Sequence, residues 1–211
     1  MATAAGRQVR PVDRGAPPEL LISLVTAQPD RKWDSGGEPD VHRAIKGSLR
    51  SAQAELCAYC EQPLLGGGQV EHIHPRTVDP CATRSNHHWH YDWTNLLLVC
   101  GSASHCDGPK ANEDWCAEVL FPDEMSPEMS YFTVNSLDGE ISVKDGLPES
   151  VWKQAKRAVD ALVLNHPNLK RSRLNVIEQL QADLSSSDQE HFALHRARCS
   201  GFPSTIEAYL A

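Results

Sequence analysis

The sequence predicts an α+β protein with a small cysteine-rich core between helical segments. Three observations favour this fold class. Six of the seven cysteines fall in residues 57–116. Short apolar segments in the same stretch have the length of strands, whereas the chain from about Glu149 onward repeats its apolar residues at helical spacing. We therefore expect a few strands held together through the cysteines, with helices before and after them.

Composition and periodicity divide the chain into three regions. Residues 1–38 are rich in proline, glycine and arginine around one apolar run, ELLISLV, and are expected to form an arm with a little helix. Residues 39–125 are expected to form the core, preceded by a helix that starts close to Asp40. The third region, 126–211, is expected to hold a hairpin and a helical C-terminal part.

The hairpin is predicted by YFTVNSLDGEISVK, in which residues alternate on either side of Asp138-Gly139. Asp-Gly is typical of the tight turn that joins two antiparallel strands. Three stretches with helical periodicity follow: ESVWKQAKRAVDALVLN, LKRSRLNVIEQLQADL and SDQEHFALHRAR.

The composition excludes some classes of protein. The formal net charge of −8 argues against a surface that binds nucleic acid throughout, because phosphate binding needs a local surplus of lysine and arginine. No apolar run approaches the roughly 20 residues that cross a bilayer, and the N-terminal residues lack the apolar stretch of a signal peptide. We expect a cytoplasmic protein without a membrane partner, whose reduced thiols are better explained by metal ligation than by disulfides.

Two cysteine pairs form the frame of a metal site. Cys57 and Cys60 stand at C-x-x-C spacing in CAYC, and Cys100 and Cys106 follow in CGSASHC. Two pairs separated by a loop are the usual source of a tetrahedral thiolate site for structural zinc. The second pair is wider than C-x-x-C, which leaves His105 open as the fourth ligand in place of Cys106. A thioredoxin-like redox pair would need a βαβ context, which the sequence does not offer.

The segment VEHIHP places an acid and two imidazoles between the cysteine pairs. We expect Val70–His74 to form a strand, NLLLV (95–99) a second strand, and DGPKANEDWCAEV (107–119) to begin a helix. Zinc would then tie the ends of this ββα unit together. Mg²⁺ prefers oxygen ligands from one or two carboxylates, for which Glu71 and Asp107 are the candidates. A neutral imidazole beside that ion is suited to deprotonate water near pH 7.

The ordered motif CAYC…VEHIHP…WTNLLLVCGSASHCDGPK resembles that of the HNH (His-Me finger) nucleases, over roughly residues 57–117. The resemblance implies a zinc-stabilised ββα-metal fold in which His72 is the general base. It also implies that Glu71 and Asp107 bind a catalytic Mg²⁺ or Mn²⁺. Asn95 would pin the loop that orients the base, and Lys110 would meet the phosphate backbone. The third letter of the motif is usually His or Asn, and here it is Asp107.

More narrowly, CAYCEQPL, HPR, DWTNLLLVCGSASHCDGPKAN and the later DGEI resemble the HNH subunits of Septu-type anti-phage systems (PtuB-like), and similar subunits occur with some retrons. This resemblance implies a DNA endonuclease that works with an ABC/SMC-like ATPase (PtuA-like). The ATPase would supply the attraction for DNA that an acidic chain lacks. In the expected reaction, His72 removes a proton from the attacking water while the ion stabilises the charge on the leaving oxygen.

Simpler interpretations of the same residues stay open. Taken alone, His72 is a core histidine or an extra zinc ligand, and His74 is a structural histidine or a contact behind the catalytic residues. The remaining clusters are expected to be surface or structural features rather than catalytic ones: the loop residues His87, His88 and His90, the helix-face residues His191, His195 and Cys199, the basic stretch Lys170–Arg173, and the unpaired Cys81 and Cys116.

Two other functions compete with the nuclease complex. One is a catalytically silent, zinc-stabilised module that recruits or regulates a partner, although such a module has no reason to keep Glu71, His72 and Asp107 together. The other is a restriction-type nuclease that acts alone, which fits less well because no groove-reading motif is evident.

Overall fold

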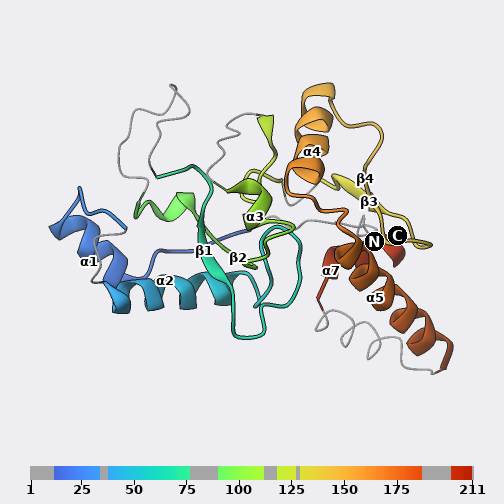
Figure 1. Ribbon diagram of the computed structural model, residues 1–211, viewed down its shortest axis with the longest axis horizontal. Coiled ribbons are helices and arrows are strands. Elements are labelled where there is room, and N and C mark those ends of the chain that lie inside the picture. The colour runs from blue at the N-terminus through green and yellow to red at the C-terminus, as the bar shows by residue number, and fades with distance from the viewer. Residues whose placement is uncertain are drawn as a thin grey trace, which may run out of the picture.

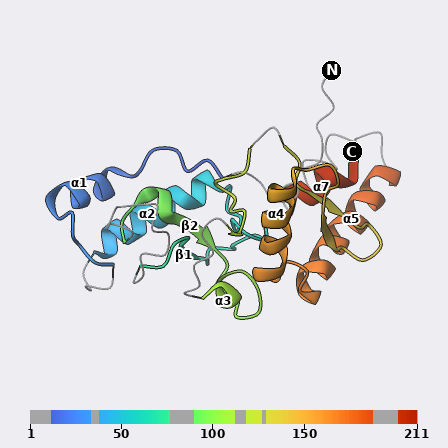
Figure 2. The same cartoon turned by 90° about the horizontal axis from the view of Figure 1, so that it is seen from above.

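The computed structural model describes residues 12–33, 38–76, 90–111, 118–126, 129–186 and 201–210. Its helices and strands follow one another along an elongated molecule, with α1 (Glu19–Ala27) near one end and α5 (Pro167–Ser186) near the other (Figures 1 and 2). The α+β prediction is confirmed. No helix in these ranges is both long and apolar enough to cross a bilayer.

Helix α2 (Pro39–Ala52) packs against the antiparallel pair β1 (Gln69–His72) and β2 (Leu96–Val99) and crosses beneath the strands in Figure 1. Its buried residues Val41, Ile45 and Leu49 recur every four positions, so one face of the helix is apolar and packs inward. Helix α1 packs on α2 through its own buried leucines, Leu21 and Leu24. The expected helix near Asp40 and the short helix in the arm are both confirmed.

Strand β2 is buried along its whole length, and its outer edge is covered by a side chain rather than a third strand. The amide of Gln53, just after α2, accepts a hydrogen bond from Leu98 N at 2.8 Å and donates one to Leu98 O. An open strand edge exposes unpaired backbone groups that cost free energy when buried, and Gln53 satisfies both of them here. The register pairs Glu71 with Leu97 and His72 with Leu96.

After β2 the chain passes through a loop to α3 (Asp107–Lys110), a single helical turn that faces β1 in space (Figure 1). The expected helix therefore begins where the sequence predicts, at Asp107, while residues 112–117 lie outside the described ranges. Gly108 is required here because an added Cβ would lie 2.5 Å from the carbonyl oxygen of Ala103. This close approach keeps Cys106 and Asp107 next to the end of β2.

The C-terminal half contains the predicted hairpin and two of the three predicted helices. Strands β3 (Phe132–Val134) and β4 (Ile141–Val143) pair antiparallel around Gly139, whose φ of +73° suits glycine. Helices α4 (Glu149–Ala161) and α5 follow, and α7 (Pro203–Leu210) packs on α5 and β3. The third predicted helix, SDQEHFALHRAR, lies outside the described residues, and α7 was not predicted.

The basic stretch around α5 corrects one expectation. Lys170 does lie at the surface and pairs with Asp138 and Glu140, but Arg173 is only 1% exposed. Its guanidinium donates to the carbonyls of Gly139 at 3.2 Å and Leu164 at 2.7 Å. Arg173 is thus a structural cation that joins the hairpin turn to the end of α4, and the planar, multiply donating guanidinium explains why a charge is tolerated inside.

Candidate functional site

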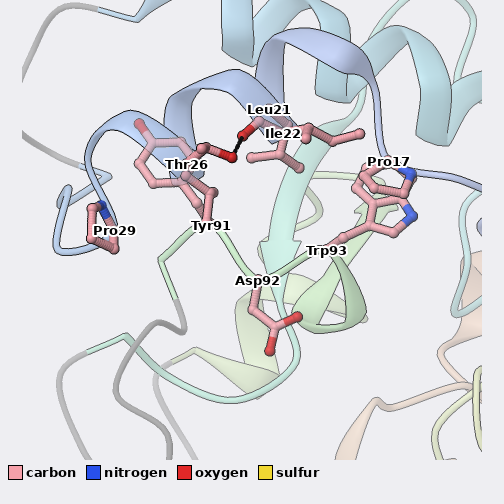
Figure 3. Close-up of a pocket in the computed structure, with 9 residues that line it drawn as sticks. Pro17, Leu21, Ile22, Thr26, Pro29, Tyr91, Asp92 and Trp93 are labelled. Carbon is pink, nitrogen blue, oxygen red and sulfur yellow. Dashed lines mark hydrogen bonds between the residues drawn. The ribbon is translucent and has the colours of Figure 1, made fainter.

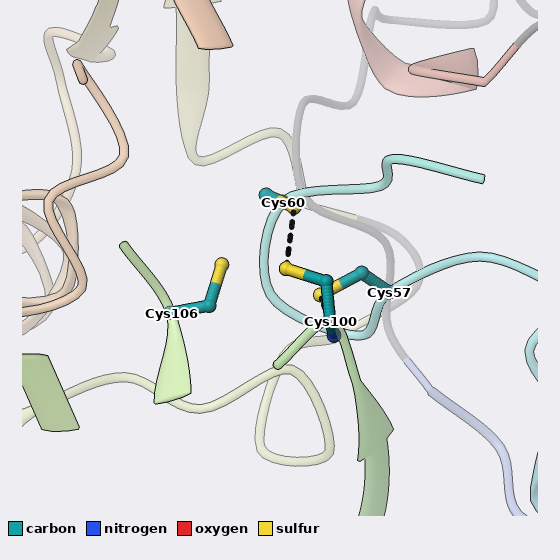
Figure 4. A group of neighbouring side chains, drawn as sticks. All are labelled: Cys57, Cys60, Cys100 and Cys106. Carbon is teal, nitrogen blue, oxygen red and sulfur yellow. Dashed lines mark hydrogen bonds between the residues drawn. The ribbon is translucent and has the colours of Figure 1, made fainter. Parts of the chain in front are cut away.

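Four cysteines converge on one point between the two halves of the molecule (Figure 4). Cys57 and Cys60 come from the turn after α2, Cys100 follows β2, and Cys106 precedes α3. Their sulfur atoms all lie within 4.8 Å of one another. The Cys60 and Cys100 sulfurs are 3.7 Å apart, close to the ~3.8 Å edge of a tetrahedron with 2.3 Å zinc–sulfur bonds. The geometry of the cluster therefore fits a structural zinc ion.

The electrostatics of the cluster also call for a cation. Burial acts to raise the pKa of Cys57, but hydrogen bonds from Cys100, Cys106 and Cys60 outweigh it and lower that pKa well below the usual thiol range. The backbone N–H of Cys100 also donates to the Cys57 sulfur at 3.3 Å. Burial and the bond with Cys100 raise the pKa of Cys60. One negative charge is thus favoured without metal, whereas a divalent ion would let all four sulfurs ionise.

Between Cys106 and His105, the geometry favours Cys106 as the fourth ligand, because its sulfur lies in the group of converging sulfur atoms. His105 Nδ1 lies beside them, 3.3 Å from the Cys106 sulfur and 3.8 Å from that of Cys100. Its ring flanks the site rather than closing it. The remaining cysteines, Cys81, Cys116 and Cys199, fall outside the described residues.

The turn that carries Cys57 and Cys60 also anchors the C-terminal helix. Glu61 directly follows Cys60, is 3% exposed, and its carboxylate accepts hydrogen bonds from the backbone N–H and the hydroxyl of Ser204 at the start of α7. Its carbonyl accepts from Phe202 N at 3.1 Å. A carboxylate at a helix N-terminus is stabilised by the unpaired N–H groups there, so this contact joins the two halves of the chain.

A second site lies where β1 meets α3, in a pocket of about 340 Å³ lined by Glu71, His72 and Asp107 among others. Burial raises the pKa of Glu71 to about 7, Lys110 opposes the rise, and a hydrogen-bonding contact with the Asp107 carboxyl adds to it. The two carboxyl groups that the sequence assigned to a divalent ion are therefore brought together. Two close carboxylates need a cation or a proton between them.

Lys110 supplies part of that positive charge from inside the protein. Its ammonium lies 2.6 Å from Glu71 Oε1 and donates to the carbonyl oxygen of His72 at 3.0 Å. At 1% exposure, the side chain is enclosed and does not project toward solvent. From the motif, Lys110 was expected to contact a phosphate backbone. In the structure its ammonium instead lies inside the protein, because the buried Glu71 carboxylate attracts it.

His72 borders the same pocket at the end of β1 and is held by a backbone group. Its Nε2 lies 3.0 Å from the carbonyl oxygen of His90. A carbonyl only accepts, so Nε2 carries the proton and Nδ1 keeps the lone pair. Burial lowers the pKa of His72 to about 4, partly offset by the His90 bond and reinforced by the charge of Arg76. The ring is therefore neutral near pH 7, as a proton acceptor must be.

Asn95 fixes the turn that follows His72. Its side-chain oxygen accepts from His74 N at 2.7 Å, and its amide donates to His74 O at 3.0 Å. The pair of bonds holds the backbone at His74, which matches the pinning function that the motif implies for Asn95. His74 itself is buried, and its backbone N–H and carbonyl are the groups that bind Asn95.

Four residues at the site were not predicted to contribute to it, and one of them, His90, was expected to be a surface loop residue. Gln69 donates to the Asp107 carboxylate, Arg76 and Trp33 line the pocket, and His90 holds His72 through its carbonyl. Gln69 shares a strand face with Glu71, so alternation along β1 could have indicated it. No sequence pattern indicates the contacts of Trp33 or of the His90 carbonyl. Trp33 is far from the motif in sequence, and the His90 contact is made by a backbone oxygen, which every residue has. His87 and His88 lie outside the described residues.

The donor set at the pocket fits a hard divalent cation. Glu71 and Asp107 offer carboxylate oxygens, the ligands that Mg²⁺ and Mn²⁺ prefer, and Glu71 Oε1 is buried with the Lys110 ammonium as its neutralising partner. A bound ion would share or replace the positive charge that Lys110 brings to Glu71 and the hydrogen bond that Gln69 donates to Asp107.

Comparison with known proteins finds a distant relative whose description is that of an HNH endonuclease. The chain is 26% identical over 145 residues to the "Retron Vc95 putative HNH endonuclease" of Vibrio cholerae serotype O1 biovar El Tor, and the match covers 66% of this chain and 66% of the relative. No family model matches the chain. The chain is thus distantly similar to an HNH-type retron protein, and this similarity supports the HNH relation without distinguishing the Septu subunits from other members.

Proposed function

We propose that this protein is a metal-dependent HNH-type endonuclease that hydrolyses phosphodiester bonds of DNA. One observation carries the proposal. A neutral imidazole, His72, with its proton fixed on Nε2 by the His90 carbonyl, borders the same pocket as the paired carboxyls of Glu71 and Asp107. A base beside a carboxylate pair suited to a divalent cation is an arrangement that supports metal-dependent phosphodiester hydrolysis.

The residues divide the reaction between them. His72 Nδ1 accepts the proton of the attacking water, while the His90 carbonyl stabilises the imidazolium that results, because Nε2–H remains its donor. Glu71 and Asp107 would hold a divalent ion, which would supply positive charge to offset the negative charge of the phosphate. Asn95 keeps the backbone after His72 in place through both of its bonds to His74. Arg76, at the pocket wall, is placed to attract the phosphate that Lys110 does not reach.

The proposal includes a defence complex with an ABC/SMC-like ATPase partner. Its support is the likeness of the motif segments to Septu-type subunits and the retron relative. The charge of the chain points the same way: a formal net charge of −8 disfavours independent binding to DNA, and Lys110 is turned inward. A positively charged partner would bring DNA to the pocket.

A second candidate is favoured by one observation. The Lys110 ammonium already neutralises Glu71, as it would in a silent zinc-stabilised module that has no use for a second metal. The two functions differ in whether an added divalent ion produces cleavage.

Supercoiled plasmid nicking separates them. The protein is first loaded with zinc, freed of other metals with a mild chelator, and checked for one zinc per chain. We expect nicking on addition of Mg²⁺ or Mn²⁺, and faster nicking when the ATPase partner is co-purified. An absence of nicking with either ion, both alone and in the complex, would leave the silent module as the better account.

A further inference from the structure

Trp33, at the end of the N-terminal arm, touches the proposed base from outside the motif. Its ring lies 4.8 Å from the ring of His72, centroid to centroid, at an interplanar angle of 88°. Its backbone N–H donates to Nδ1 of His90 at 3.1 Å, and the carbonyl of that same His90 holds His72 Nε2. The three residues therefore form a closed set of contacts in which Trp33 meets His72 directly and through His90.

The ring of Trp33 is itself fixed by two aromatic neighbours. It stacks on His42 of α2 at 4.1 Å with an angle of 19°, and its centroid lies 5.0 Å from that of Tyr91. The hydroxyl of Tyr91 and His42 Nε2 are 2.9 Å apart. Tyr91 also borders an apolar hollow of about 400 Å³ beneath α1, where Leu21 and Ile22 face it (Figure 3). The arm is thus packed against the residues that hold Trp33.

The contacts of Trp33 restrict the orientation of the His72 ring, which the backbone of β1 does not fix. His72 is the last residue of β1, and the hydrogen bond at Nε2 fixes one ring atom, so the tilt of the ring plane depends on the side chains packed against it. An edge-to-face contact favours one relative orientation of two rings. Fixing the ring plane fixes the direction of the Nδ1 lone pair, and small misplacements of a catalytic group carry a large cost in rate.

We propose that Trp33 is a positioning residue for His72, which sets the orientation of the imidazole through the edge-to-face contact and through His90. It acts on the base and not on DNA, so the N-terminal arm is part of the working site. This inference rests on the proposed function, in which His72 accepts the proton of water.

The test compares Trp33→Ala and Trp33→Phe with Trp152→Ala, a matched deletion at a residue of α4 that is 38% exposed and does not line the pocket. All variants are first checked for zinc content and thermal unfolding. We expect Trp33→Ala to lower kcat for plasmid nicking by about 10- to 100-fold with KM for DNA unchanged. Trp33→Phe, which keeps an aromatic edge, should recover most of the rate, and Trp152→Ala should match the wild type.

Two further measurements separate positioning from general packing. In the zinc-loaded protein without added Mg²⁺, the ¹⁵N and ¹H signals of the His72 ring should shift or broaden in Trp33→Ala but stay in place in Trp152→Ala. In a His72→Ala background, adding Trp33→Ala should change the residual rate less than about twofold, because a positioning residue acts only through its partner. An unchanged His72 spectrum, or an equal loss of rate in both backgrounds, would overturn the inference.

The His72→Ala variant distinguishes a failure of the proposed function from a failure of the role assigned to Trp33. If His72→Ala nicks DNA at the wild-type rate, the proposed function fails whatever Trp33 does. If His72→Ala is impaired while Trp33→Ala keeps both the wild-type rate and the wild-type ring signals, only the role of Trp33 fails.

Discussion

The ammonium of Lys110 lies 2.6 Å from Glu71 Oε1 in the protein interior, where Lys110 is 1% exposed. This pair connects α3 to β1 and sits at the edge of the pocket that contains His72. Because both charges are withdrawn from water, each depends on the other far more than surface ions do.

Replacing Lys110 with methionine should destabilise the protein by about 3 kcal/mol, since it leaves the Glu71 carboxylate buried without its partner. The double variant Glu71→Gln/Lys110→Met should recover much of this loss. Urea unfolding of the zinc-loaded protein measures both. Lys153→Met is the control, because Lys153 pairs with Glu149 on an exposed helix face and should cost less than about 0.5 kcal/mol. Equal losses for Lys110→Met and Lys153→Met would contradict the buried pair.

Replacing Cys100 with serine should remove zinc and unfold the core. The free energy of binding structural zinc is also folding free energy, and the cluster joins β2, the turn after α2 and the start of α3. Metal analysis should give less than one zinc per chain, and circular dichroism should report lost structure. Ser102→Ala, on the same loop and at a hydroxyl that hydrogen-bonds with Ser104, should keep its zinc. A folded Cys100→Ser variant that binds no zinc would refute a structural role for the ion.

The pH dependence of stability should include a contribution from His72. Burial lowers its pKa from 6.5 to about 4, so between these values the unfolded chain binds a proton that the folded protein does not. Stability is therefore lost as pH falls through 6.5. Between pH 7.5 and pH 5.5 the wild type should lose roughly 1 kcal/mol more than His72→Gln, measured by urea unfolding. Parallel losses in the two proteins would show that His72 titrates in the folded state as it does in solution.

Replacing Arg173 with methionine should destabilise the C-terminal half by about 3 kcal/mol. The substitution leaves the buried carbonyls of Gly139 and Leu164 without their donor, and buried unpaired polar groups are costly. Arg43→Met is the matched control, since Arg43 is largely exposed beside Asp40 and should change stability little. Thermal unfolding of both variants provides the comparison, and a mild Arg173→Met would argue against a structural cation.

Much of the fold near the site could be predicted from the sequence. The spacing of Cys57, Cys60, Cys100 and Cys106 indicated a shared metal site, because thiolate pairs and their loop have few other uses in a reducing compartment. The short β-rich runs around His72 and Leu97 had the length of strands, and the Asp138-Gly139 dipeptide marked the hairpin. Each cysteine pair, each strand and the hairpin turn is encoded in a few neighbouring residues, which is why the sequence alone indicated them.

The contacts that place the side chains could not be predicted in the same way. Lys110 was expected to meet the phosphate backbone, yet its ammonium is buried against Glu71. Arg173 looked like part of a charged helix face because its partners are carbonyls of distant turns, which sequence patterns do not display. Trp33 and His72 are separated by 38 intervening residues, and no sequence pattern in the arm indicates that their rings are in contact. Long-range pairing of this kind depends on tertiary packing rather than local propensity.

The rate of plasmid nicking by His72→Ala tests the central claim most directly. Under single-turnover conditions with Mg²⁺, in a variant whose zinc content and unfolding midpoint match the wild type, we expect the rate to fall by about 10²- to 10⁴-fold, the usual contribution of a general base. A His72→Ala protein that nicks DNA within about threefold of the wild-type rate would contradict the assignment of this imidazole as the proton acceptor.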